Sequence, residues 1–209
     1  RESHPLGMTL NTVRKIPRWC YFLIFGIFAI YGHSLLPVGN FKGIIYVVYS
    51  VVTLAALIIG IQRRDFQTFG PWHILAFGFG VNILADALYY YCTIFEISVP
   101  YPSLIDAIYL SGYVIRSLAL HAMNQARMRH QDLSGWIDSL IIGCGVGLLS
   151  WIFLMEPYAD NTSMTILERA VSIAYPLMDV LTLAMVARMW ISPGKRPPAY
   201  FLLGAGLSL

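Results

Sequence analysis

Charged residues are scarce in this chain. Only 12% of its 209 residues are Asp, Glu, Lys or Arg, whereas soluble domains carry about 25%. Hydrophobic residues make up 57% of the sequence, and the mean hydropathy is +0.65. This composition excludes an ordinary soluble domain, so we expect an all-α integral membrane protein. The net charge of +3 is too small to indicate binding to nucleic acid.

Other absences exclude particular chemistries. The three cysteines, Cys20, Cys92 and Cys144, form no CxxC pair, so no disulfide framework or metal site is predicted. No lysine falls within a predicted span, which excludes a retinal Schiff base in this region. Nucleophile, zinc-protease and phosphate-loop motifs are also missing, so we predict no catalytic residue and interpret the region as non-enzymatic. We expect the small residues of 77–80 and 143–147 to serve close helix packing.

Six apolar segments are long enough to cross a bilayer, which takes about 20 residues. They cover residues 19–38, 43–62, 71–95, 102–124, 135–155 and 166–191. A seventh begins near residue 198 and reaches Leu209 before it has crossed, so we expect a longer protein. We interpret residues 1–7, which precede Met8, as a tag remnant, and residues 8–209 as one transmembrane domain.

Basic residues alternate between the loops on the two sides of this predicted bundle. The N-terminal segment and the loops on the same side of the bundle carry ten basic residues: Arg14, Lys15, Arg18, Arg63, Arg64, Arg127, Arg129, Arg188, Lys195 and Arg196. The loops on the other side carry only Lys42 and Arg169. Because basic loops stay in the cytoplasm, the pattern predicts a cytoplasmic N-terminus.

The fourth span carries a polar stripe. Helical spacing places Ser103, Asp106, Tyr109, Tyr113 and Arg116 on one face of an otherwise apolar helix. An ionised group that faces lipid costs several kcal/mol, so this stripe must face protein, water or a ligand.

Depth along the helices predicts two polar clusters. An outward-facing ligand pocket would be lined by Asn82, Asp86, Asp106, Tyr109, Tyr113, Tyr175 and, at the rim, Glu156. A deeper ion network would join Arg116 with Asp179 and Asp138, since Arg116 and Asp179 both lie about 20 Å from the outer surface. Pro176 is expected to kink the sixth helix beside this network.

Plainer alternatives stay open for these residues. The Arg116 network can be a structural ion pair that only fixes helix packing, and Asp106 can cap the N-terminus of its own helix. A bis-histidine haem between His73 and His121 is conceivable, but we interpret both as packed or interfacial residues and predict no cofactor.

The motifs together resemble a known class of membrane region. The residues that carry the resemblance are Asp86, the string Tyr101-Pro-Ser-Leu-Ile-Asp-Ala-Ile-Tyr-Leu-Ser-Gly-Tyr113, Trp136-Ile-Asp-Ser-Leu-Ile141, Trp151-Ile-Phe-Leu154 and Ala174-Tyr-Pro-Leu-Met-Asp179. In this order they resemble the multi-span N-terminal regions of bacterial, often actinobacterial, signalling proteins. There the region precedes cytoplasmic GGDEF/EAL domains, which make and break cyclic-di-GMP, or histidine kinase domains.

The resemblance implies a sensor module in the bacterial inner membrane. It would bind a small molecule, ion or lipid and control an output domain through which the protein forms a homodimer. Two alternatives remain: a transporter of protons or small solutes that uses the buried carboxylates, or a membrane anchor and dimerisation module without a ligand. A lipid enzyme would need a nucleophile or metal cluster, which the sequence does not offer.

Overall fold

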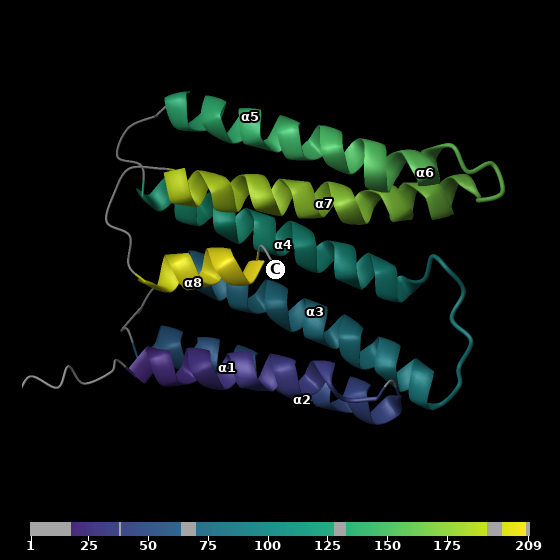
Figure 1. The fold of residues 1–209 in the computed structure, drawn as a ribbon, viewed down its shortest axis with the longest axis horizontal. Helices are drawn as coiled ribbons and strands as arrows, with labels where there is room; N and C mark the ends of the chain where they lie inside the picture. Colours follow the sequence, from purple (N-terminus) through teal and green to yellow (C-terminus); the bar gives the residue numbers. More distant parts are fainter. Residues whose placement is uncertain (1–17, 38, 64–69, 128–132, 192–197, 208–209) are drawn as a thin grey trace, which may run out of the picture.

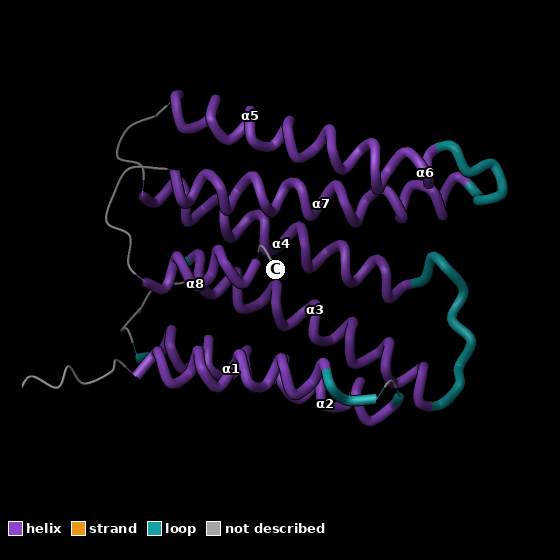
Figure 2. Tube along the Cα trace, in the orientation of Figure 1, coloured by secondary structure: helices purple, strands orange, loops and turns teal. Residues whose placement is uncertain are grey.

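The computed structural model describes residues 18–37, 39–63, 70–127, 133–191 and 198–207. Most of this part of the chain is helical and none of it forms a strand, which confirms the predicted all-α class (Figure 2). The elements in chain order are α1 (Arg18–Ser34), α2 (Asn40–Gln62), α3 (Pro71–Ile94), α4 (Leu104–Arg127), α5 (Leu133–Ser150), the π-helix η1 (Trp151–Met155), α6 (Glu156–Ala159), α7 (Ile166–Ile191) and α8 (Pro198–Leu207).

Helix starts follow the local sequence. Pro71 occupies the first turn of α3, where a missing N–H costs nothing. Before α7, Thr165 and Glu168 form a reciprocal capping box: the Thr165 N–H donates to the Glu168 carboxylate at 2.5 Å, and the Glu168 N–H donates to the Thr165 hydroxyl at 3.3 Å. These bonds satisfy backbone donors that a helix N-terminus leaves without partners.

The fifth predicted segment ends later than expected. The segment was predicted to end at residue 155, just before Pro157, but helical structure continues through η1 and α6 to Ala159. Pro157 lies in the first turn of α6, which follows the π-helix η1. A proline is tolerated in a first turn because the N–H that it lacks has no helical partner there. The other predicted segments each overlap one observed helix.

The helices lie side by side in the order α5, α7, α4, α3, α2 and α1, and α8 packs against α7 (Figure 1). The N-terminus of α1 lies at the same end of the bundle as the C-termini of α2, α4 and α7. The α3–α4 loop and the α6–α7 turn lie at the opposite end. The distribution of basic residues requires successive helices to alternate in direction in this way. The alternation does not fix which end of the bundle is cytoplasmic.

Four stretches are long and apolar enough to cross a membrane: Asn40–Gln62, Pro71–Ile94, Leu140–Ala159 and Ile166–Trp190. Their outward faces carry many large exposed hydrophobic side chains, as lipid contact requires. In α1 the apolar stretch Leu23–Ser34 is shorter, and α4 carries the polar stripe. The structure therefore supports a membrane protein, while the count of six spans and a partial seventh stays a prediction.

The apolar core joins three helices. Leu75 of α3, Ala119, Leu120 and Met123 of α4, and Val186 of α7 form one buried cluster. Farther along the α3–α4 contact, Asn82 of α3 packs onto Gly112 of α4 so closely that a Cβ there would overlap its side-chain oxygen. The small residue thus brings the two helices together, as the sequence predicted for other glycines in this chain.

Candidate functional site

The polar stripe of α4 faces its two neighbouring helices, α3 and α7. At the start of the stripe, the backbone N–H and the hydroxyl of Ser103 both donate to Asp106 Oδ2, at 2.8 and 2.9 Å. The capping role that we left open for Asp106 is therefore confirmed. The second carboxylate oxygen, Oδ1, accepts a 2.8 Å hydrogen bond from the Tyr175 hydroxyl of α7. Asp106 is thus a structural tie between α4 and α7.

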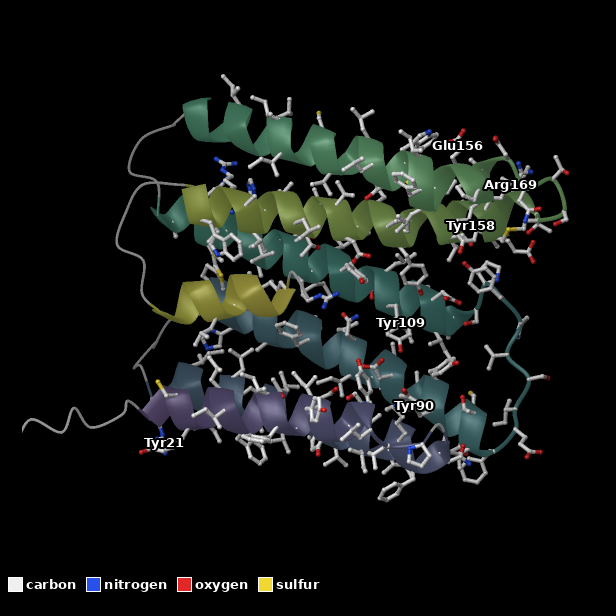
Figure 3. All side chains as sticks on the ribbon, viewed as in Figure 1. Tyr21, Tyr90, Tyr109, Glu156, Tyr158 and Arg169 are labelled. Atoms are coloured by element: carbon white, nitrogen blue, oxygen red, sulfur yellow. The ribbon has the colours of Figure 1, made fainter. Side chains whose placement is uncertain are left out.

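Asp86 is held on the other side of α4. The Tyr109 hydroxyl donates a 2.5 Å hydrogen bond to Asp86 Oδ1, and Tyr46 of α2 interacts with the same carboxylate. Figure 3 shows Tyr109 in the space between α3 and α4. Tyr109 therefore supplies the hydrogen-bond donor that an intramembrane carboxylate needs.

Arg116 lies deeper in the bundle and stacks on aromatic rings. Its guanidinium carbon is 4.4 Å from the centroid of the Tyr113 ring and 5.5 Å from that of Phe79, within the range of cation–π attraction. Tyr113 interacts with both Arg116 and Asp179. In the described part of the chain, no hydrogen bond or ion pair joins Arg116 to Asp179, so the predicted ion pair is not formed, although both residues and Tyr113 line one cavity.

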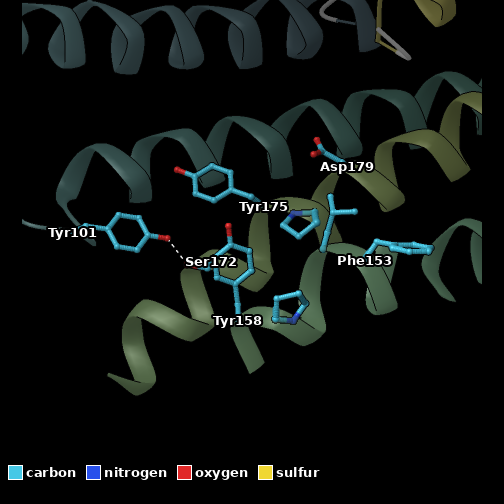
Figure 4. A pocket seen from close by; sticks show the side chains of 9 residues that line it. Tyr101, Phe153, Tyr158, Ser172, Tyr175 and Asp179 are labelled. Carbon is cyan, nitrogen blue, oxygen red and sulfur yellow. Dashed lines mark hydrogen bonds between the residues drawn. The ribbon is translucent and has the colours of Figure 1, made fainter. Parts of the chain in front are cut away.

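Two cavities meet at Asp179. The first, which we call the tyrosine cavity, has a volume of about 480 Å³ and is lined by Tyr101, Phe153, Leu154, Pro157, Tyr158, Ser172, Tyr175, Pro176 and Asp179 (Figure 4). The second, the arginine cavity, has a volume of about 450 Å³ and is lined by Phe79, Tyr113, Arg116, Asp179, Thr182, Leu183, Gly206 and Leu207. Asp179 is the residue that lines both.

The predicted pocket is therefore divided. Tyr175 lines the tyrosine cavity and Tyr113 the arginine cavity. Asp86, Asp106 and Tyr109 are engaged in bonds between helices, and Asn82 is packed against Gly112. Glu156 is exposed at the start of α6. Asp138 belongs to α5, but its side chain lies outside the described residues.

Sequence reasoning missed Tyr46, Phe153 and Tyr158. Tyr158 lies in α6, beyond residue 155, where the fifth segment was predicted to end, and Phe153 lies within that segment but in the π-helix η1. A π-helix is produced by a local shift of hydrogen bonds and has no sequence signature of its own, although π-bulges often lie at functional sites. No sequence pattern indicates Tyr46, because the face of α2 that packs against α3 cannot be predicted from the sequence.

His73 and His121 each make a hydrogen bond close to themselves in the sequence. The Gly70 N–H donates to His73 Nδ1 at 3.2 Å, which caps α3, and His121 Nε2 lies 2.8 Å from the Gln125 side-chain nitrogen on α4. Across the described residues, no group of three or more His, Cys, Asp or Glu side chains is arranged to hold a metal ion.

No protein-family model, curated protein or solved structure matches this chain. The fold and site alone define its class: an all-helical protein with helices long and apolar enough to cross a membrane, in which tyrosine–aspartate hydrogen bonds link α4 to α3 and α7. Its function must be argued from these groups.

Proposed function

We propose that this chain is a membrane-embedded signal-input module that binds a small solute between its helices. The observation that carries the proposal is the position of Asp179. This residue is exposed within Ile166–Trp190, a segment apolar enough to span a membrane, and it opens into two cavities. Exposing a carboxylate to lipid costs several kcal/mol, so the Asp179 side chain must meet water or a ligand.

The second step of the proposal is transmission along α7. This helix packs against α4, α5 and α8, and it contains Pro176 beside the tyrosine cavity. Proline leaves one helical hydrogen bond unmade, so the helix bends more easily at that point. If a solute binds one arrangement of α7 more tightly than the other by a few kcal/mol, it increases the population of that arrangement.

The resemblance described above supplies the third step. In the proteins that this chain resembles, the membrane region controls a GGDEF/EAL or histidine kinase domain in the cytoplasm. By that analogy the shift of α7 would pass through α8 to an output domain of the same protein, in the bacterial inner membrane.

Thermal unfolding of the purified protein with a panel of small solutes tests the binding step. We expect a solute to raise the melting temperature of the wild type and to have no effect on Asp179→Asn. Glu156→Gln is the matched control, because Glu156 is a nearby exposed acid that does not line either cavity.

Spin labels at Gln125 of α4 and Leu202 of α8, both exposed, test the transmission step. The stabilising solute should change the distance distribution between the labels in the wild type but not in Asp179→Asn. Binding without any change in this distance would contradict a signalling role.

One observation favours a second candidate, a transporter. Two cavities that meet at a single carboxylate also describe a path on which that carboxylate relays a proton or cation. Proteoliposomes with a trapped pH-sensitive dye separate the two functions. A signal-input module gives no flux above empty liposomes, whereas a transporter gives a flux that Asp179→Asn abolishes.

A further inference from the structure

The tyrosine cavity has an unusual combination of lining groups. Its nine lining residues include four aromatic rings and one carboxylate, and they contain no Lys, Arg or His. The rings come from the α3–α4 loop, η1, α6 and α7, so that separate elements converge on one space. Figure 4 shows Tyr101 on the left of the group of side chains and Asp179 and Phe153 on its right.

Hydrogen bonds hold two of these rings in place. The Tyr101 hydroxyl is 2.7 Å from the Ser172 hydroxyl (Figure 4), and the Tyr175 hydroxyl donates to Asp106. Their polar ends are thus occupied, and what they present to the cavity is the ring. The electron-rich face of an aromatic ring attracts cations.

Pro176 has no N–H and cannot donate to the carbonyl of Ser172, four residues earlier in α7. Both residues line the tyrosine cavity, together with the Asp179 carboxylate and with no Lys, Arg or His. The cavity lining is therefore poor in fixed positive charge.

The arginine cavity shows the contrast. There the chain itself supplies the cation, since Arg116 stacks on Tyr113 and Phe79. A second cation in that cavity would be repelled by the guanidinium. The tyrosine cavity offers the same kind of aromatic and acidic surroundings without a resident positive charge.

We propose that the tyrosine cavity binds an organic ammonium ion, with the charge facing Asp179 and the substituents packed between Tyr158 and Phe153. Carboxylate plus aromatic rings is the arrangement that recognises protonated and quaternary amines. The volume of about 480 Å³ lies within the range of small-molecule sites. This inference rests on the proposed function and specifies the chemistry of its ligand.

The probe is radiolabelled benzyltrimethylammonium, measured by equilibrium dialysis on the protein in an uncharged maltoside detergent. We expect saturable binding that unlabelled probe competes away and benzoate, an anion of similar size, does not. Asp179→Asn should weaken binding by at least about tenfold, as expected for a lost charge interaction. Tyr158→Leu should weaken it by about fivefold, the scale of one cation–π contact.

Two controls guard the interpretation. Glu156→Gln should leave the affinity unchanged, because this exposed acid does not line the cavity. If Asp179→Asn does not fold, Tyr158→Leu carries the test, because it removes one aromatic ring from the cavity and leaves the charge of Asp179 in place. Unchanged binding by Asp179→Asn or Tyr158→Leu, no binding at all, or displacement by benzoate would each overturn the proposal.

The ammonium group can belong to a free amine or to a lipid headgroup, and nanodiscs distinguish these sources. Discs of phosphatidylcholine should compete with the probe if the source is a lipid, whereas discs of phosphatidylglycerol should not. Equal probe binding in both discs assigns the site to a free amine. If the probe does not bind but another solute stabilises the wild type and not Asp179→Asn, only the proposed ligand class is refuted. Failure of every solute would refute the proposed function as well.

Discussion

At the scale of single residues, Asn82 of α3 and Gly112 of α4 are in close contact. Gly112 is buried, and a methyl group on it would overlap Asn82 Oδ1. This contact decides how near α3 and α4 can lie. The geometry of Asp86 and Tyr109 depends on it, because their 2.5 Å hydrogen bond spans the same two helices.

Gly112→Ala should therefore destabilise the protein by about 1–3 kcal/mol, the usual cost of overpacking. The measurement is the apparent melting temperature of the detergent-purified protein. Gly145→Ala is the matched control, because that glycine of α5 has open space around it, and alanine there should be neutral or slightly stabilising. Asn82→Ala in the Gly112→Ala background should recover part of the loss. A Gly112→Ala protein as stable as the wild type would contradict the packing described here.

Tyr109→Phe removes the hydroxyl that donates to Asp86 and leaves the ring in place. We expect a loss of about 1 kcal/mol, because hydrogen bonds between membrane helices are worth about 0.6 kcal/mol on average and the abandoned carboxylate adds to the cost. Chemical denaturation in mixed micelles measures it. Tyr31→Phe, an exposed tyrosine on α1, should change nothing. Equal stabilities for the two variants would show that the bond between Tyr109 and Asp86 contributes nothing.

At the scale of elements, the sequence predicted helices well and their contacts less well. Apolar runs, capping residues and prolines locate α2, α3, α4 and α7 because hydrophobicity and backbone sterics act locally. The partner of each polar residue depends on helix rotation, which local rules leave undetermined. Thus Asp106 was expected in a ligand pocket and instead links Ser103 to Tyr175.

Pro176→Ala tests α7 as an element. The helix assignment is continuous through Pro176, so alanine can supply the missing N–H without rebuilding the fold. We expect amide hydrogen exchange over residues 172–180 to slow, because the Ser172 carbonyl gains its donor. We also expect any solute-induced distance change between Gln125 and Leu202 to shrink. Faster exchange in this segment would contradict the role of the proline as a weak point of α7.

At the scale of the whole molecule, the arrangement of helix ends makes the topology testable. Gln62 ends α2, and Ser98 lies in the loop after α3, at opposite ends of the bundle; both are exposed. With Cys20, Cys92 and Cys144 replaced by alanine, we introduce Gln62→Cys or Ser98→Cys. A membrane-impermeant maleimide added to spheroplasts should label the Ser98→Cys protein and not the Gln62→Cys protein. The reverse labelling would invert the predicted orientation.

The polar stripe of α4 has a consequence for how the protein is made. Of the helices in the described part of the chain, α4 is as long as α3 but is not among the four stretches apolar enough to cross a membrane alone. A translocon that samples hydrophobicity one segment at a time would release this helix poorly into lipid. We therefore expect α4, a predicted span, to enter the bilayer together with a neighbour that already offers partners, and Asp86 on the preceding helix provides one for Tyr109. Biogenesis of the bundle would then be cooperative, with α3 and α4 inserting as a hairpin.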